Sequence, residues 1–530
     1  MKQITLKEIC YYSFFGLLFM AKGIGMYDGQ RLFKVILLCA CIFWIGKMIL
    51  TPYSIKEILV IGTLLVLGAA SYYFSGDKGA LIAVMTIVGM KDIPIKRLFK
   101  IGLIIWSISF WGTITAALLG LKSSAMFVHN KSGLGFVIRS SLGLTHPNVL
   151  HISYMVFVAL WFLVNNFKGK ALMKAVGLSF VGSLFIFMYS LSYTGFLFFI
   201  AYLVLVVYLT QARRRSKAEN VILQCLMPLC VAFSILGPVL LHGRLFDLVN
   251  KAVNTRFELS RHYLTTLTPG MFGTQVNIEG NYTIDCSYVH CLYYYGIFLF
   301  LLFMLGLFVT IRYLVNNGRN QELAMTLGLV AAGFTEPFLF NFSFKNIILP
   351  IMGEMLFVYL AVPGRWKCFE VNIQISRKQR SYTWRENLVL KAFVQKLRAI
   401  IVTHKKALWT GAAVGMLMGG VIGSQCVYVE PYVIVNKDTS DRVGKKGDYK
   451  IYQDLPEEIK ENSLKINVYD DHTKVFVLSG SITEYEEIRK KITVCFYGGA
   501  CGIVLVTAVL LWQQSRKKDH ENFNAGELES

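Results

Sequence analysis

Three arginines between residues 241 and 287, namely Arg244, Arg256 and Arg261, have the chemistry to hold a phosphate group. A guanidinium stays charged when partly buried and can donate two parallel hydrogen bonds to phosphate oxygens. We therefore interpret this stretch as a candidate binding segment for phosphate or diphosphate. A solvated basic loop without a ligand would have the same composition, and the sequence alone leaves both interpretations open.

Titratable groups near these arginines could move protons in a reaction: His146, His262, Asp285 and His290. A carboxylate or imidazole within hydrogen-bond reach of a substrate hydroxyl can act as its general base. Asp285 opens the run Asp-Cys-Ser-Tyr, which closes with Tyr288. The same segment enters the next apolar stretch, so Asp285 and Tyr288 are expected at the mouth of a helix.

A second candidate run, Arg-Ser-Ser-Leu-Gly-Leu-Thr-His-Pro-Asn, occupies residues 139–148. Pro147 fits the first turn of a helix, where its missing N–H costs nothing. Arg139, His146 and Asn148 would then lie together at one end of that helix. The alternative is an interfacial loop in which Arg139 extends to the lipid headgroups.

One carboxylate, Glu336 in Gly-Phe-Thr-Glu-Pro, falls inside an apolar segment at 323–341. A carboxylate at membrane depth costs about 2.5–3.5 kcal/mol on insertion scales, so it normally faces a cavity or a partner. Glu336 is therefore a further candidate for binding substrate. Its place near one end of the segment weakens this argument.

The elements that position these residues are apolar helices. The chain has 530 residues, is 55% hydrophobic with mean hydropathy +0.51, and is only 16% charged. A helix needs about 20 mostly apolar residues to cross the hydrocarbon core, and apolar blocks without period-2 alternation favour helices over barrel strands. The sequence predicts an all-α polytopic membrane protein with about twelve core spans: 11–26, 33–50, 57–74, 79–90, 101–121, 148–165, 175–189, 195–210, 221–241, 288–311, 323–341 and 346–363.

Charge sets the expected orientation of these spans. The net charge is +22, and the lysines and arginines gather in five segments that fall on one side of the bundle: 91–100, 168–174, 213–217, 312–319 and 365–406. The positive-inside rule makes that side cytoplasmic, which places both termini in the cytoplasm. Nucleic-acid binding is therefore not expected. The segments 122–147 and 241–287 would face the outside.

The C-terminal part has a different organisation. A basic cytoplasmic linker at 364–406 follows the membrane domain, 1–363, and leads to a two-span hairpin at 407–512 and a cytoplasmic tail at 513–530. The first hairpin span carries Gly411, Gly415, Gly419 and Gly423. Glycines four residues apart form one flat helix face that lets another helix approach closely, although incidental glycines are the alternative. The residues between the spans, 425–490, predict a small α+β extracytoplasmic domain.

Cofactor and metal motifs do not occur in the sequence. Most of the 11 cysteines lie in apolar segments, with no CxxC or His-Cys spacing, so we interpret them as small buried hydrophobes. Neither a P-loop nor a GxGxxG run precedes a helix. We expect no metal and no cofactor.

Taken together, these features resemble the superfamily of O-antigen ligases and Wzy-type polysaccharide polymerases. The resemblance covers about residues 10–363 and has a twelve-span layout. Four further features carry it: residues 139–148, similar to the family's R-x-S-L-G-hydrophobic-x-H-P-N; the turn 190–195; the long segment from Gly243-Arg244 to Asp285-x-x-Tyr288; and residues 333–336. Tyr193 stands where the family often has arginine, and Asp285 where the ligases tend to have histidine. The aspartate favours a polymerase.

The resemblance implies a GT-C-like membrane glycosyltransferase of the bacterial cytoplasmic membrane. Its metal-independent reaction would move glycan from an undecaprenyl diphosphate donor to a hydroxyl of another lipid-linked repeat unit, as in capsule, exopolysaccharide or O-antigen synthesis. Asp285, His146 and Arg139 would be catalytic. The other expected contacts bind diphosphate or substrate: Arg244, Arg256, Arg261, Asn148, Tyr288 and Glu336. Further implied partners are a chain-length regulator or a flippase.

Two alternatives remain at this point. A related ligase would move finished glycan to a different acceptor. A flippase or another transporter of lipid-linked sugar would carry ionisable residues deep in several spans, whereas here the candidate residues gather at one face. The hairpin at 407–512 resembles the polysaccharide chain-length regulators in layout alone.

Overall fold

The computed structural model describes most of the membrane-embedded chain and parts of the C-terminal region. The described residues are 3–122, 124, 126–131, 135–211, 215–253, 255–276, 283–361, 372–373, 381–383, 399, 402–427, 432–436, 442–443, 449–452, 467–470, 473–477 and 480–527. They divide into two units. The first unit comprises Met1–Lys2, Met126–Arg139 and Thr383–Ser530, and the second comprises Gln3–Ala125 and Ser140–Tyr382.

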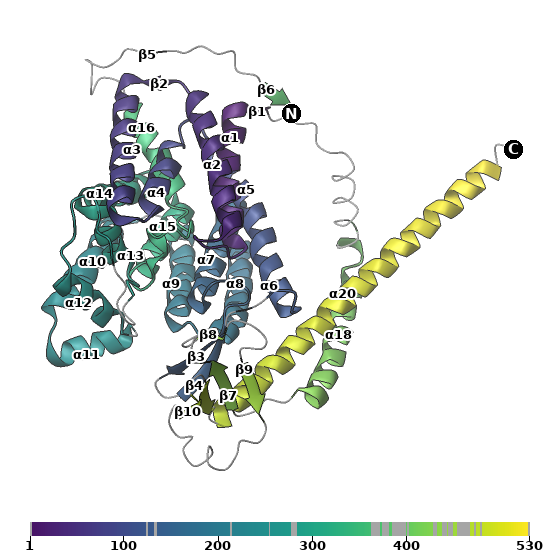
Figure 1. Ribbon diagram of the computed structural model, residues 1–530. Coiled ribbons are helices and arrows are strands. Elements are labelled where there is room, and N and C mark those ends of the chain that lie inside the picture. Colours follow the sequence, from purple (N-terminus) through teal and green to yellow (C-terminus); the bar gives the residue numbers. More distant parts are fainter. Residues whose placement is uncertain are drawn as a thin grey trace. The chain divides into compact units, whose positions relative to one another are not determined.

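The second unit is a bundle of helices (Figure 1). Its longer helices are α1 Leu6–Gly23, α2 Arg31–Ile49, α3 Ile55–Ser75, α4 Gly79–Val88, α5 Ile95–Trp106, α6 Gly112–Leu118, α7 Pro147–Asn165, α8 Gly169–Ser190, α9 Tyr193–Gln211, α10 Lys217–Leu240, α14 Gly296–Asn316, α15 Asn320–Ala332 and α16 Leu349–Leu360. A π-helical turn, Ser107–Trp111, joins α5 to α6, and α13 Ser287–His290 with a second such turn leads into α14. The described bundle therefore follows the predicted order of apolar segments.

Ten helices in the described residues are long and apolar enough to cross a membrane. The chain is thus a multi-pass membrane protein whose membrane-crossing elements are α-helices. Four of the twelve predicted core spans correspond to helices outside that set: α1, α4, α15 and α16. Of these, α4, α15 and α16 have 10, 13 and 12 residues, fewer than the roughly 20 that a straight crossing needs. The count of twelve stays a prediction.

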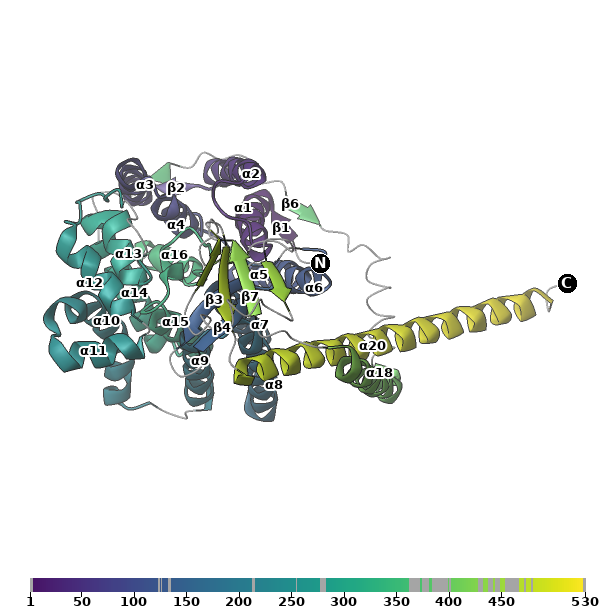
Figure 2. The ribbon, with the colours of Figure 1, turned by 60° about the horizontal axis from the view of Figure 1, so that its bottom comes forward.

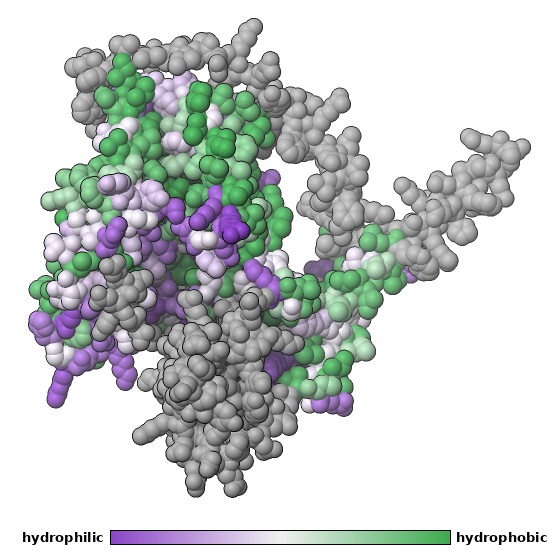
Figure 3. Space-filling model, viewed as in Figure 1, coloured by the Kyte–Doolittle hydropathy of each residue, from purple (hydrophilic) through white to green (hydrophobic). Residues whose placement is uncertain are grey.

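Burial along the bundle separates a central helix from peripheral ones. The apolar window of α7 is 67% buried, against 17% for α2. Large apolar side chains of α2 such as Leu32, Val35 and Leu38 are exposed, as expected for a helix that faces lipid. Apolar side chains cover the sides of the helices in Figure 3, and hydrophilic ones gather around their lower ends in that view.

Several successive helices are joined by short connections and pack against each other, among them α1 and α2, α7 and α8, and α8 and α9. Such neighbours run in opposite directions. We call the end of the second unit where α1 begins the basal end, and the end where α1 finishes the distal end. Capping boxes start α1, α3 and α10 at the basal end, with Thr5, Ser54 and Ser216 as N-caps. Each places a glutamate over the first turn, where the helix dipole favours negative charge.

The long distal segment at 241–287 differs from its prediction as a loop. It contains two helices, α11 Gly243–Ala252 and α12 Arg256–Thr266. Helix α12 packs against α10, and α11 packs against α12 (Figures 1 and 2). Apolar periodicity did not reveal α12 in the sequence, because polar residues occur on every face of this helix.

In the first unit, two helices form a hairpin: α18 Lys405–Cys426 and α20 Gly480–Glu527. The predicted close approach of a glycine face is confirmed, because a Cβ on Gly415 would meet the carbonyl oxygen of Gly498 at 2.0 Å. A Cβ on Gly502 would likewise meet the carbonyl oxygen of Gly411 at 2.0 Å. Sequence reasoning had not identified Gly498 and Gly502, which complete the contact.

Strands accompany this hairpin in the first unit. An antiparallel sheet has the order β10-β11-β7-β9, with bounds Asn467–Asp470, Thr473–Val477, Tyr432–Asn436 and Tyr449–Tyr452. Strand β3 (Met126–Lys131) pairs with β8 (Arg442–Val443) through Met126↔Val443, a long-range pairing that the sequence did not predict. Most of the linker 364–406 and much of 425–490 lie outside the described residues, so that domain division stays a prediction.

Candidate functional site

Side chains from several elements of the second unit meet at the carboxylate of Glu336. Its Oε1 accepts hydrogen bonds from Asn148 Nδ2 at 3.0 Å and from Thr194 Oγ1 at 3.4 Å. The same oxygen lies 2.7 Å from Arg256 Nη2 in an ion pair. The three donors come from the first turns of α7, α9 and α12. Four segments that are distant in sequence therefore converge on one carboxylate at the distal end.

The position of Glu336 corrects the predicted span 323–341. Helix α15 ends at Ala332, and Glu336 has an extended backbone with φ −134° and ψ 136°. Pro337 explains this conformation, because a proline disfavours the helical region for the residue before it. Glu336 thus lies beyond the helix in the irregular segment 333–348, and not inside a continuous membrane helix.

Arg256 is engaged with protein atoms at each of its three nitrogens. Besides the bond to Glu336, Nε donates to the carbonyl oxygen of Thr335, and Nη1 donates to that of Val253 at 3.3 Å. These bonds use three of the five guanidinium N–H groups. Arg256 is 5% exposed and Glu336 is 6% exposed, so the pair is a buried one with its charges compensated by each other.

Asp285 supplies an accessible carboxylate beside this buried pair. Its Oδ2 lies 3.9 Å from Arg256 Nε, and its Oδ1 accepts a hydrogen bond from Thr283 Oγ1 at 2.9 Å. The side chain is 33% exposed. A partly exposed carboxylate held next to a guanidinium can receive a proton from a hydroxyl group that approaches from solvent.

Ser287 ties the start of α13 to the segment that carries Glu336. Its Oγ donates to the backbone oxygen of Glu336 at 2.5 Å and accepts from the backbone N–H of Leu339 at 3.2 Å. Its own N–H donates to the oxygen of Gly333 at 2.9 Å. The sequence analysis did not assign roles to Ser287 or Thr194. Both lie inside short runs that it had singled out, 285–288 and 190–195.

His146 has a defined role at the start of α7. It is the N-cap residue, and its Nδ1 accepts a hydrogen bond from the backbone N–H of Asn148 at 3.1 Å. In the neutral ring Nε2 then carries the proton, so this nitrogen donates and does not accept. The geometry therefore suits His146 to orienting Asn148 toward Glu336, and favours Asp285 as a base.

Two other predicted residues of the arginine stretch lie apart from Glu336. Arg261 donates to the backbone oxygens of Pro238 and Leu241, and its guanidinium lies 3.7 Å from the ring centroid of Phe246. It therefore holds α10, α11 and α12 together. Arg244 is exposed in the first turn of α11.

Tyr288 and His290 are buried in the helix that follows Asp285. Tyr288 is fully enclosed, and its hydroxyl donates to the backbone oxygen of Val330 at 2.7 Å. His290 stacks on Tyr294 with ring centroids 4.3 Å apart. These contacts give both residues a packing role between α13 and its neighbours.

Arg139 belongs to the first unit, where it is the last residue of the segment 126–139 and is buried. The positions of the two units relative to one another are not determined. The assignment of Arg139 as a catalytic residue therefore stays a prediction.

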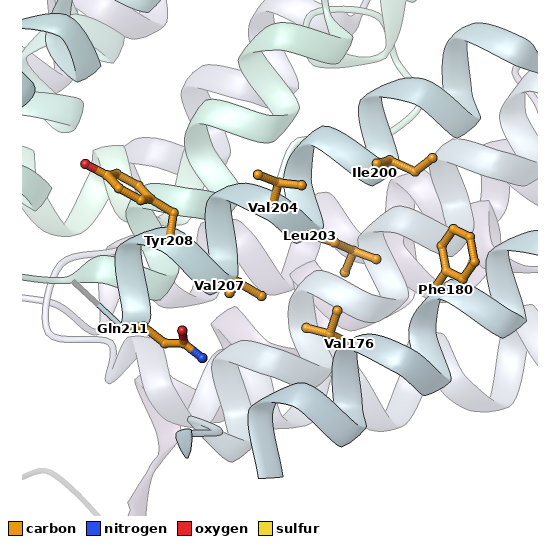
Figure 4. A pocket seen from close by; sticks show the side chains of 8 residues that line it. All are labelled: Val176, Phe180, Ile200, Leu203, Val204, Val207, Tyr208 and Gln211. Carbon is orange, nitrogen blue, oxygen red and sulfur yellow. The ribbon is translucent and has the colours of Figure 1, made fainter. Parts of the chain in front are cut away.

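A groove of about 680 Å³ lies between α8 and α9 (Figure 4). Its lining consists of Val176, Phe180, Ile200, Leu203, Val204, Val207, Tyr208 and Gln211. No charged side chain is among them, and Gln211 ends α9 at the basal end, whereas Thr194 begins α9 at the distal end. The groove suits an alkyl chain and has none of the groups that the candidate chemistry requires.

Metal ligands do not cluster in the described part of the chain, where no group of three or more His, Cys, Asp or Glu side chains could hold an ion. Comparison of the chain with protein-family models, with curated proteins and with solved structures finds no match. The candidate site is therefore defined by its own geometry around Glu336.

Proposed function

We propose that this membrane protein is a glycosyltransferase that polymerises lipid-linked saccharide units. One observation carries the proposal: the separate runs that resemble the polymerase superfamily converge on Glu336. Asn148 comes from the first run, Thr194 from the second, and Asp285 lies 3.9 Å from the arginine that is paired with Glu336. If these runs served only to fold the protein, their polar residues would not all need to meet at one carboxylate.

The proposed reaction forms one glycosidic bond and breaks another. A hydroxyl oxygen of the acceptor saccharide attacks the anomeric carbon of the donor, and its proton passes to the Asp285 carboxylate. The donor's bond to the prenyl diphosphate breaks, and the diphosphate leaves with the electron pair. A diphosphate is already a stabilised anion, so nearby positive charge is the main assistance that the protein must supply.

The proposal includes a location and an orientation. The donor is an undecaprenyl diphosphate lipid, so the reaction belongs at the outer face of the bacterial cytoplasmic membrane. The distal end would face outward and both termini would lie in the cytoplasm, as the basic segments at the basal side suggest. The reaction needs no metal in this scheme.

The test is reconstitution of the purified protein in liposomes with a lipid-linked repeat unit from its own source. The parent should build a ladder of longer products on a gel, and Asp285→Asn should reduce the initial rate at least about 100-fold, the usual contribution of a general base. Glu258→Gln is the matched control, because Glu258 is an exposed carboxylate in α12. It should retain the parent's rate.

Other outcomes would assign a different function. Transfer of preformed glycan to a different acceptor, without chain growth, would identify a ligase. Movement of the lipid-linked sugar between leaflets without any glycosidic bond formation would refute the transferase and identify a transporter. Equal rates for Asp285→Asn and the parent would remove Asp285 from the mechanism.

A further inference from the structure

Two buried lysines at the distal end of the second unit lack the partners that other enclosed basic residues have. Lys22 lies in the last turn of α1 and is 8% exposed, and Lys345 lies in the segment before α16 and is 4% exposed. Among the described residues, neither forms an ion pair or donates a hydrogen bond. By contrast, the fully enclosed Lys47 donates a hydrogen bond to the Tyr53 hydroxyl at 3.1 Å. Most other buried and half-buried basic residues that the structure describes in the unit have an acidic partner: Lys7–Asp92, Lys78–Asp28, Lys91–Glu57, Arg97–Glu8, Arg256–Glu336 and Arg319–Glu354.

Aromatic side chains bring the two lysines to one place. The Nζ of Lys22 lies 4.2 Å from the ring centroid of Phe33 and 4.6 Å from that of Phe342. Three residues after Phe342 comes Lys345, and the intervening Phe344 packs its ring against Phe15 of α1 at 5.5 Å. The segment 342–345 therefore lies on α1, and the two ammonium groups are close enough to repel each other. Burial and this repulsion lower the pKa of Lys345 to about 7.

The acidic residues nearby do not neutralise this pair. Asp28 is committed to Lys78, with Nζ and Oδ2 2.6 Å apart. The Oδ1 of Asp77 accepts a hydrogen bond from the backbone N–H of Gly79 at 2.6 Å, and burial raises the pKa of this carboxyl. Neither acid is ion-paired with Lys22. Among the described residues neither lysine has a direct ion pair, two positive charges buried in this way are unfavourable, and a bound anion would relieve that cost.

We propose that Lys22 and Lys345 form a binding site for the phosphate groups of a lipid, and that its ligand is a prenyl diphosphate. Lysine is a compact point charge that suits phosphate. This identity rests on the proposed function, which supplies such a lipid as donor and product. The lysines would hold the diphosphate by their charge, whereas Arg256 uses three of its five N–H groups on protein atoms.

The surroundings favour a lipid over a soluble anion. Phe33 belongs to α2, whose neighbouring side chains Leu32 and Val35 are exposed on a membrane-spanning helix. A headgroup at Lys22 can therefore keep its hydrocarbon chain along the outer surface of α2. A free phosphate would gain the ionic contacts but nothing from this apolar surface.

The experiment measures binding of undecaprenyl diphosphate to the full-length protein in detergent, by native mass spectrometry, without any transfer reaction. We expect Lys22→Met and Lys345→Met each to raise Kd about tenfold, the effect of losing one hydrogen bond between charged groups. Lys34→Met is the matched control, because Lys34 is exposed in the first turn of α2 near the same end. It should change Kd less than twofold. Thermal unfolding of each variant establishes that it is folded.

The outcomes separate this inference from the proposed function. Equal binding by the parent and both folded variants would overturn the lysine site and leave the polymerase proposal intact. If the parent binds the lipid but builds no polymer, and the lysine variants lose binding, the result would support the lysine site and refute the polymerase. Competition by phosphatidylglycerol or inorganic pyrophosphate at the same concentration as the prenyl lipid would overturn the prenyl diphosphate as ligand. Failure of undecaprenyl diphosphate to bind the parent would overturn the inference altogether.

Discussion

At the scale of single residues, the Arg256–Glu336 pair is the most constrained feature of the candidate site. A buried ion pair adds little net stability compared with apolar residues, but removal of one partner leaves an uncompensated buried charge. Asn148, Thr194 and Ser287 add hydrogen bonds that fix the position of Glu336. The pair thus specifies how α7, α9 and α12 meet, beyond its own contribution to stability.

Glu336→Gln should lower the free energy of unfolding by about 3 kcal/mol, the lower end of the range for breaking a buried pair, because the more distant and partly exposed Asp285 carboxylate would be the remaining counter-charge of Arg256. Denaturant or thermal unfolding of the purified protein in detergent measures this loss. The double variant Arg256→Met/Glu336→Gln should recover part of it. A single variant as stable as the parent would show that the pair is open to water in solution.

The lowered pKa of Lys345 predicts that the stability of the protein depends on pH, in a direction that can be stated. Its pKa is lowered from 10.5 to about 7 in the folded protein, so the unfolded chain binds more protons between these values. Stability contributed by this group therefore rises with pH from about 7 to about 10. The difference in melting temperature between the parent and Lys345→Met, measured across this range in detergent, should change in favour of the parent as pH rises. A constant difference would contradict the lowered pKa.

Several residues of the site could be predicted from sequence and others could not. Asn148, Asp285 and Glu336 were identified because each belongs to a short polar run next to or within an apolar segment, and Arg256 because a guanidinium can bind phosphate. Lys22 and Lys345 were not, because a lysine near the end of an apolar helix is ordinarily a topological signal. Their lack of partners becomes visible only once the helices are packed.

At the scale of elements, the glycine spacing correctly predicted a helix contact, whereas the predicted helix ends were less accurate. The face of α18 contacts α20 as its four-residue spacing predicts, since backbones approach closely where no Cβ intervenes. The predicted end of the span 323–341 was wrong, because the apolar run continues past Pro337. The helix itself, α15, already ends at Ala332. An apolar sequence indicates that a segment is buried, and buried irregular segments are apolar too. Hydrophobicity alone therefore does not show where a helix ends.

Gly415→Ala should separate α18 from α20. The added Cβ would lie 2.0 Å from the carbonyl oxygen of Gly498, so the helices must move apart. Gly420→Ala is the control, because its Cβ would meet only the Cys495 sulfur at 3.4 Å. Spin labels at Trp409 and Leu505, in a background without other cysteines, should report a longer or broader distance distribution for Gly415→Ala alone. Identical distributions for both variants would show that the helices are not in close contact.

At the scale of the whole molecule, the charge distribution predicts which end of the second unit faces outward. Impermeant thiol labelling of single-cysteine variants in intact cells measures it. Met271→Cys, at an exposed distal position, should react in intact cells. Lys170→Cys, exposed at the basal end, should react only after the cells are permeabilised. The reverse pattern would invert the topology and place the Glu336 site in the cytoplasm.

The convergence on Glu336 has a consequence for the order in which the chain is made. Arg256 precedes Glu336 by 80 residues, which a ribosome needs about 4–16 s to translate at 5–20 residues per second. Throughout that interval the guanidinium lacks its buried partner Glu336, and Asp285 is the one of its two carboxylate neighbours that is made before the interval ends. The contacts of Arg261 with α10 can form before then, but the hydrogen bonds of Asn148, Thr194 and Arg256 to Glu336 cannot. The site is thus assembled late, and a nascent chain that stalls before residue 336 cannot contain it.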